Sequence, residues 1–324
     1  MFARRTSHDA SAATTLSLSN TGTGTPGPEK EPGVPDHGSP TVRRRRLAAE
    51  LRRLRESAGL RGEEAAARLG WSASKLSRIE TSKSGIKQSD LRLLLDLYRV
   101  GEAHRSEVLA LARESAKTAW VDDAAMANFP AGYAAYVYAE AEAATLWHWA
   151  PQVIPGLLQT QSYAREVVLG WHSMFNLPPT ELDARVEARM RRQQVLTREQ
   201  PLDLCAVIDE SVLRRRMGDI SIMRDQLGRL VESSRMPNVE LRILPLDGDH
   251  PVGTGEFTYM RFAQVHDVRL PDIVNTEHLE GDYRVENAAD TNQYRVAFEH
   301  LRSHALDSAQ SLDVITHIAQ KVWS

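Results

Sequence analysis

The sequence predicts a chain of two folded domains, an all-helical domain over residues 43–112 and an α+β domain over residues 120–324. Apolar residues recur at helical spacing through the first region, whereas the second alternates helical segments with short β-branched and aromatic runs. The charge also changes sign between them. Residues 43–100 hold 15 Lys and Arg against 7 Asp and Glu, a net charge of +8, while residues 101–324 hold 22 against 32, a net charge of −10. At 324 residues in total, each region is long enough to bury a core of its own.

The segment before the first domain has a different composition. Residues 1–42 are rich in Ser, Thr, Gly and Pro and hold few large apolar residues, so burial cannot offset the entropy of ordering them. We predict a disordered tail there. Arg4 and Arg5 are followed by no apolar segment of a targeting signal, and no run of eighteen apolar residues occurs in the chain. We therefore expect no membrane span and a cytoplasmic location.

Residues 62–79 predict two short helices joined by a tight turn. Ala66 supplies a small residue where the second helix crosses the first, and Gly70 tolerates the positive φ that the turn needs. Ser72 is placed to accept a hydrogen bond from the first turn of the second helix. This pattern is a helix-turn-helix, which makes double-stranded DNA the first partner to consider.

The second of these helices is predicted to run from Ser72 to about Thr81 and to enter the major groove of DNA. Its inner face is apolar and its outer face is small and polar. The residues predicted to face base edges are Ala73, Ser74, Ser77 and Arg78. Arg78 is the strongest of them, because its guanidinium fork matches O6 and N7 of guanine. A phosphate contact or an ion pair with a neighbouring acid is the alternative for Arg78.

Basic and hydroxyl side chains around this helix are predicted to hold the DNA backbone, which sets register without reading sequence. The residues predicted to contact phosphates are Arg61, Ser72, Lys75, Lys83, Lys87, Arg43, Arg44, Arg45 and Arg46. The four consecutive arginines stand just ahead of the first predicted helix. They can act as a minor-groove arm or as a general phosphate-attracting tether, and the tether is the favoured interpretation.

Helices are also predicted on both sides of the motif. One precedes it and ends at Gly59. Another follows it, capped by Ser89, with Asp90 in its first turn and Gly101 after its end.

The sequences LRRLRE (51–56), ARLGWS (67–72) and KLSRIE (75–80) together resemble the phage-repressor (Cro/XRE-like) helix-turn-helix family. The resemblance covers four or five short helices within residues 43–112. It implies a sequence-specific DNA-binding regulator of transcription.

Two departures from this family bear on specificity. The family often has Ser or Thr followed by Gln where this chain has Arg61 and Gly62, so the cap of that helix is lost. Ala73 stands where the family often has a base-reading Gln, and it can contact only a thymine methyl. Both departures suggest modest specificity for a single copy. We therefore expect a symmetric homodimer that reads two half-sites about one helical turn apart, roughly 34 Å.

The second domain is predicted to contain a small sheet and two C-terminal helices. The expected strands are 202–208, 239–244, 256–262 and 272–276. The expected helices are 135–147, 185–196, 221–233, 290–305 and 309–322, and a loop over 149–160 leads into a further helix.

No arrangement in this domain is typical of an active site. Cys205 lies in an apolar run and is predicted to be a core residue, and His300 and His304 lack a third metal ligand and are predicted to be surface residues. Gly253–Glu256 lacks the pattern of a dinucleotide site and is predicted to be a hairpin loop. Pro155–Leu158 fits either the wall of a ligand pocket or partner groove, or a structural turn. We predict no enzymatic activity, no catalytic residue, no metal and no cofactor.

A second resemblance covers this domain. The segments 149–160, 209–215 and 237–245 look like the C-terminal domain of a group of actinobacterial regulators that includes WhiJ-like and antitoxin-like proteins. The resemblance implies a regulator whose second domain mediates assembly and binds a small partner protein. The alternative is a one-component regulator whose second domain binds a small-molecule effector.

Overall fold

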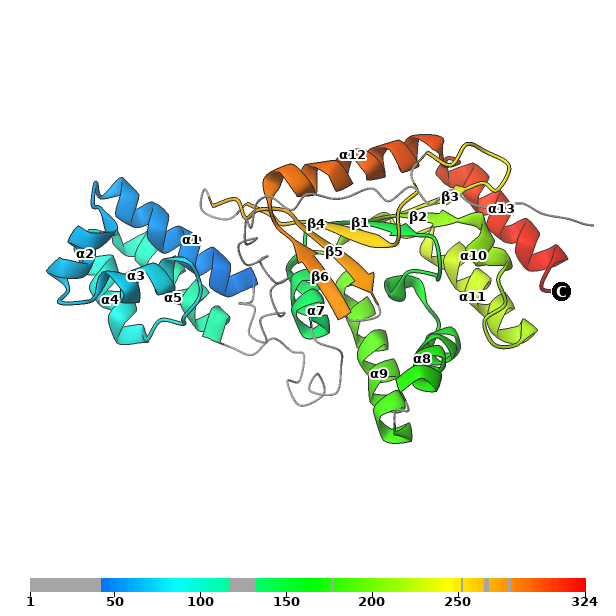
Figure 1. Ribbon diagram of the computed structural model, residues 1–324, viewed down its shortest axis with the longest axis horizontal. Coiled ribbons are helices and arrows are strands. Elements are labelled where there is room, and N and C mark those ends of the chain that lie inside the picture. The colour runs from blue at the N-terminus through cyan, green and yellow to red at the C-terminus, as the bar shows by residue number, and fades with distance from the viewer. Residues whose placement is uncertain (1–41, 117–131, 176–177, 252, 265–267, 279–280) are drawn as a thin grey trace, which may run out of the picture. The chain divides into compact units, whose positions relative to one another are not determined.

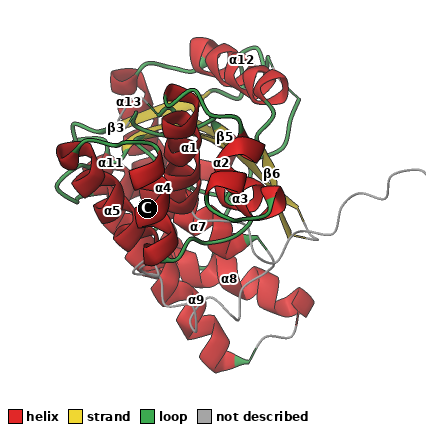
Figure 2. Ribbon diagram, turned by 90° about the vertical axis from the view of Figure 1, so that its left-hand side faces the viewer, coloured by secondary structure: helices red, strands yellow, loops and turns green. Residues whose placement is uncertain are grey.

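The computed structural model describes residues 42–116, 132–175, 178–251, 253–264, 268–278 and 281–324 (Figure 1). The prediction of a disordered tail over residues 1–42 lies outside these residues, except for residue 42. Described residues up to Ala116 form helices only (Figure 2). These helices are α1 (Val42–Ser57), α2 (Gly62–Arg68), α3 (Ala73–Glu80), α4 (Gln88–Leu97) and α5 (Glu102–Ala116).

The first five helices enclose an apolar core of their own. Leu51 of α1, Leu76 of α3 and the α4 residues Leu91, Leu94 and Leu95 are all buried in it. Their spacing of three and four residues puts them on one side of each helix, which is why the helices form together rather than singly.

The turn between α2 and α3 is as the sequence predicts. Gly70 has φ +67°, a conformation that strains residues with a side chain. The Ser72 hydroxyl accepts a hydrogen bond from the Lys75 amide at 3.2 Å and so caps α3. Arg61, in the N-cap position of α2, makes no capping hydrogen bond with its side chain, as expected from the missing Ser or Thr.

The boundaries of α4 differ from the prediction. The helix begins two residues earlier, so its N-cap is Lys87, which has no side-chain acceptor to offer, and Ser89 lies inside the first turn. At the other end the left-handed residue is Arg99, with φ +54°, rather than Gly101. Packing of the buried leucines therefore sets the register of α4, and it overrides the preference for a hydroxyl cap and a terminal glycine.

One ion pair fixes the ends of α1 and α3. The Arg55 Nε and Nη2 atoms donate to the Glu80 carboxylate at 2.8 and 3.0 Å, and Arg55 Nη1 donates to the Leu60 carbonyl at 2.7 Å. Both side chains are largely buried. Glu80, the last residue of KLSRIE, thus has a structural role.

The second domain contains six strands and further helices. The strands are β1 (Thr145–Ala150), β2 (Asp203–Asp209), β3 (Val239–Leu244), β4 (Phe257–Arg261), β5 (Ile273–His278) and β6 (Gly281–Val285). The α-helices are α7 (Tyr133–Glu142), α8 (Gln161–Phe175), α9 (Pro179–Arg192), α10 (Glu210–Arg214), α11 (Ile220–Ser233), α12 (Ala288–His304) and α13 (Ser308–Lys321). Two 3₁₀ turns, η1 (Gly156–Leu158) and η2 (Gln193–Leu196), precede α8 and follow α9.

The strands form one mixed sheet in the order β3-β2-β1-β4-β5-β6. The first three are mutually parallel, and β4, β5 and β6 are added antiparallel. Helix α12 lies along one face, and α7, α9 and α11 lie on the other (Figure 1). The architecture confirms an α+β domain with C-terminal helices.

Alternate residues of the central strands fill two cores. Leu204 and Ala206 of β2 face the large core that also contains α11 and α13, whereas Cys205 and Val207 face the core under α12. Because both faces are covered, residues 204–208 of β2 have no polar side, which is the usual state of buried parallel strands.

Three predictions for this domain are wrong. The helix predicted over 135–147 ends at Glu142, and the residues from Thr145 begin the central strand β1. The sheet gains β6, which the sequence pattern did not indicate. Gly253–Glu256 is not a hairpin loop, because it joins β3 to β4, and two strands lie between them in the sheet.

The helices of the described residues include none that is both long and apolar enough to cross a membrane.

Candidate nucleic-acid interface and a cavity in the second domain

The outward face of α3 carries the residues predicted to read bases. Ala73, Ser74, Ser77 and Arg78 are all exposed, while Leu76 turns inward. The Ser72 cap fixes the first turn of this helix. The four side chains therefore present a surface small enough to approach base edges, with one guanidinium near its C-terminal end. Their roles in reading DNA stay predictions.

Four of the cations predicted around this helix are open to solvent. Arg61, Arg78, Lys83 and Lys87 are exposed, and within the described residues their side chains make no hydrogen bond or ion pair. No acid of the described residues neutralises them, so each offers its charge to a phosphate or a base.

Lys75 differs from these four. Its Nζ atom lies 3.7 Å from the centroid of a Trp71 ring and 2.9 Å from Asp90 Oδ2. The ion pair joins the first turn of α3 to that of α4. Lys75 therefore holds the two helices together, and part of its charge is compensated by Asp90.

The beginning of α4 is a feature that the sequence analysis missed. Since Lys87 offers no capping acceptor, the first amide groups of this ten-residue helix lack the usual side-chain partner. The Lys75–Asp90 ion pair places them beside the start of α3. Uncapped amides and the positive end of the helix dipole favour a phosphate oxygen. The absence of a hydroxyl or carboxylate side chain at position 87 could have indicated an uncapped helix. Ser89, two residues later, instead suggested a capped one.

The four consecutive arginines do not precede the first helix, as the sequence suggested, but form its first turn. All described residues belong to one unit spanning 37–324. Within it Arg43 Nη2 lies 2.6 Å from Glu142 Oε1, and Arg45 Nη2 donates to the Glu286 carboxylate at 2.6 and 2.8 Å.

Arg46 Nη2 donates to the Ala263 carbonyl at 3.2 Å, and burial lowers the pKa of Arg46. Acids and carbonyls far along the chain thus engage three of these guanidiniums. Their phosphate contacts, as a minor-groove arm or as a phosphate-attracting tether, stay predictions.

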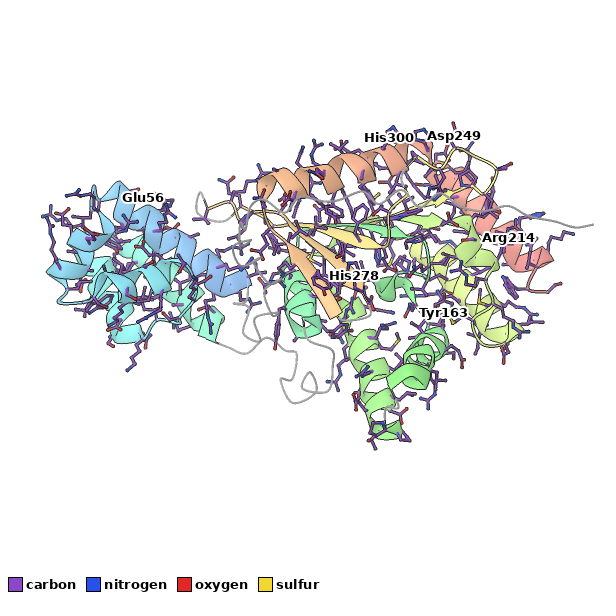
Figure 3. The ribbon with its side chains drawn as sticks, in the orientation of Figure 1. Glu56, Tyr163, Arg214, Asp249, His278 and His300 are labelled. Atoms are coloured by element: carbon purple, nitrogen blue, oxygen red, sulfur yellow. The ribbon has the colours of Figure 1, made fainter. Side chains whose placement is uncertain are left out.

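The second domain contains a cavity of about 530 Å³, partly open to solvent, that is lined by residues of the sheet and of the helices α7 and α9. Its lining includes His148 of β1, Thr258 of β4, Glu277 of β5, Asp282 of β6 and Arg189 of α9. Gly156 of the Pro155–Leu158 segment also lines it, while Leu157 and Leu158 are buried in the core, so this structural turn contributes one residue to the pocket wall. His278, at the end of β5, marks its position in Figure 3.

Other side chains considered from the sequence have structural surroundings. Cys205 is buried, and burial raises the pKa of its thiol to about 12, so it is a core residue. His300 and His304 are exposed on α12, where His300 is labelled in Figure 3. Among the described residues no group of three or more His, Cys, Asp or Glu is arranged to hold a metal ion.

Comparison with known families finds matches in both domains. Residues 46–108 match a helix-turn-helix domain, and residues 133–317 match a domain of unknown function, DUF5753. Neither the curated proteins nor the solved structures include a match to this chain. Because the second match spans more than half of the 324 residues, the chain belongs to the DUF5753 family, and it carries a helix-turn-helix domain ahead of the family's domain.

Proposed function

We propose that this protein is a sequence-specific DNA-binding regulator of transcription in which α3 reads the major groove. The observation that carries the proposal is the exposed face of α3, which is small and polar and bears Arg78 without any acid partner in the described residues. Lys83 and Lys87 follow it as unpaired cations of the described chain. Such a surface combines a base-reading guanidinium with phosphate contacts that set its position.

We further infer that the regulator acts as a homodimer in the cytoplasm and belongs to the Cro/XRE-like group. A single α3 offers one long hydrogen-bonding side chain to bases, Arg78, since Ala73, Ser74 and Ser77 are short. Two copies on an inverted repeat double the contacts, and the symmetry of the protein then matches that of the operator.

The second domain admits two roles. In the first, it mediates assembly and binds a small partner protein, as in WhiJ-like and antitoxin-like regulators. In the second, it binds a small-molecule effector, and the cavity of about 530 Å³ is the specific observation that favours this role. Ligand pockets in proteins commonly have volumes of roughly 300–1,000 Å³. In either role the domain acts by binding rather than by catalysis.

Selection of bound fragments from randomised DNA by the full-length protein, at near-physiological salt, tests the proposal. Enrichment of an inverted repeat supports a dimeric, sequence-reading regulator and supplies its operator. Salt-sensitive binding of all fragments without enrichment contradicts sequence-specific recognition by the protein alone. A single, asymmetric enriched site contradicts the dimer but not DNA reading.

A further inference from the structure

A row of polar side chains crosses the sheet on the face that α7 and α9 cover. His148, Thr258, Asn275 and Arg284 are direct neighbours across β1, β4, β5 and β6, so their side chains share this face. The first three are buried. The large apolar core covers the same face over β2 and β3. This face is therefore apolar at one end of the sheet and polar along the row. Buried polar residues are uncommon in a core unless they have partners.

One member of this row lacks a partner. Thr258 is only 5% exposed, it lines the cavity, and its Oγ1 atom makes no hydrogen bond within the described residues. Its neighbours are satisfied, since His148 Nε2 lies 2.8 Å from Glu256 Oε1 and Asn275 Nδ2 donates to Asp282 Oδ1 at 3.3 Å. A buried hydroxyl without a partner costs free energy, unless a bound molecule completes its hydrogen bond.

The charged groups at the cavity wall indicate the sign of the charge that the bound molecule carries. Glu277 of β5 and Asp282 of β6 stand directly opposite each other in the antiparallel pair, an unfavourable position for two like charges. Glu277 makes no hydrogen bond or ion pair in the described residues, and Asp282 has only the amide of Asn275. Loss of solvation at the pocket wall, together with the negative charges of Glu256 and Asp282, raises the pKa of Glu277 to about 7, although the residue keeps contact with solvent.

The positive groups at the wall do not balance these acids. The buried Glu140 carboxylate accepts hydrogen bonds from Arg192 Nε and Nη2 at 2.8 and 2.7 Å, and so it compensates that guanidinium. Arg189 donates to Gln159 Oε1 at 3.3 Å and has no carboxylate partner in the described residues. The positive charges of Arg189 and Arg192 act on Glu277, and those of Arg192 and Arg284 act on Asp282, but neither carboxylate forms an ion pair within the described residues.

We propose that this cavity binds a small organic cation, an amine or guanidinium compound, whose charged group lies between Glu277 and Asp282. The cation relieves the repulsion between the two carboxylates, and its remaining polar groups reach the Thr258 hydroxyl. An inorganic or carboxylate anion is disfavoured, because it would meet two facing carboxylates that have no ion-pair partner in the described residues. Any effect of the ligand on DNA binding rests on the proposed function; binding in the cavity does not.

Titration calorimetry of the full-length protein with agmatine, which carries a guanidinium and an ammonium group, tests the proposal without DNA. We expect saturable binding at about 0.15 M salt. Glu277→Gln and Asp282→Asn should each weaken it by at least about tenfold, since each removes one charge-assisted contact. Glu199→Gln, at an exposed site without a side-chain partner in the described residues, is the matched control and should bind as the wild type does.

Thermal unfolding without ligand shows whether each variant is folded. Glu277→Gln should unfold at a higher temperature than the wild type, because it removes the repulsion with Asp282. The proposal is overturned if agmatine shows no saturable binding up to about 50 mM, a range that would include very weak sites. Equal binding of glutarate, or unchanged binding by both charge-neutral variants, would also overturn it. DNA binding is measured separately, so either proposal can fail alone.

Discussion

Arg78 and the two lysines after it are predicted to contribute to DNA binding in different ways. Arg78→Ala should weaken binding to the operator by about 1–3 kcal/mol and leave binding to unrelated DNA nearly unchanged, because a guanidinium paired with guanine discriminates between bases. Lys83→Ala or Lys87→Ala should weaken binding to every sequence and lower the slope of log affinity against log salt by about one. Fluorescence anisotropy with operator and scrambled duplexes over a salt series measures both effects.

Arg235→Ala provides the control for these variants. Arg235 is an exposed arginine after α11, in the second domain, and its loss changes the net charge by the same amount. It should leave both affinity and salt slope as in the wild type. If the Arg78 and lysine variants lose affinity equally for both duplexes, the distinction between base reading and phosphate contact is wrong.

His104 makes the stability of the helical domain depend on pH. Its Nε2 atom lies 2.6 Å from Oε1 of the buried Glu50, and its Nδ1 atom lies 3.0 Å from Glu107 Oε2. Burial lowers the pKa of His104, but the hydrogen bonds to the two carboxylates outweigh burial and raise it overall. The stabilisation is therefore complete below the unfolded pKa of about 6.5, and it is lost as pH rises through the higher folded value.

His104→Gln should consequently destabilise the helical domain more at about pH 6 than at about pH 8. Hydrogen exchange of the α1 and α5 amides localises the effect, since Glu50 lies on α1 and His104 on α5. The control is His317→Gln on α13, outside this domain. A loss of protection in His104→Gln that is equal at both pH values contradicts the assignment.

At the scale of single elements, the caps of α2 and α3 predict opposite responses. Ser72→Ala removes the hydroxyl that accepts from the Lys75 amide and should cost about 1 kcal/mol of stability. Arg61→Ser places a hydroxyl at the uncapped start of α2 and should stabilise by up to about 1 kcal/mol. Since Arg61→Ser also removes a predicted phosphate contact, DNA affinity should fall while the melting temperature rises. If DNA affinity and melting temperature instead rose together or fell together, Arg61 would affect DNA binding through the stability of the fold.

The helix-turn-helix could be predicted because its signals are local. Gly70 and Ser72 lie next to the structures that they determine. Strand β1 could not be predicted for two reasons. Thr145–Ala150 is covered on both faces, so apolar and polar residues do not alternate along it. Its aromatic residues also continue the pattern of the preceding helix. Strand β6 is short and polar, with Asp282 and Arg284 directed to the cavity side.

The cavity was beyond prediction for a related reason. Its acids are Glu277 of β5, Asp282 of β6 and Glu256, which directly precedes β4, and they approach one another only through the pairing of β4, β5 and β6. The arginines of α1 likewise find their acids 99 and 241 residues away. The spacing of residues in the sequence does not indicate contacts between residues so far apart. The register of strand pairing and the packing of the elements determine them.

At the scale of the whole molecule, charge is divided between the two domains. The +8 of residues 43–100 attracts DNA, and the −10 of residues 101–324 repels it. The affinity of the whole protein for DNA of unrelated sequence should therefore be lower than that of the basic domain alone. Discrimination between the operator and other DNA then depends on contacts with bases rather than on total charge.

The dimer hypothesis leads to a test in which only the spacing of the operator changes. Two half-sites one helical turn apart, about 10 base pairs, lie on the same side of DNA and can both meet an α3 helix of a symmetric dimer. Inserting about five base pairs turns one half-site to the opposite side, so only one α3 helix can bind its bases. Affinity should then fall to that of a duplex with one half-site, and inserting about ten base pairs should restore part of it. Electrophoretic mobility shifts across these spacings measure the effect, with the phosphate-contact variant Lys87→Ala as a control that weakens binding at every spacing. Affinity that is indifferent to spacing would mean that each copy binds DNA independently, and the operator would then be read by a monomer.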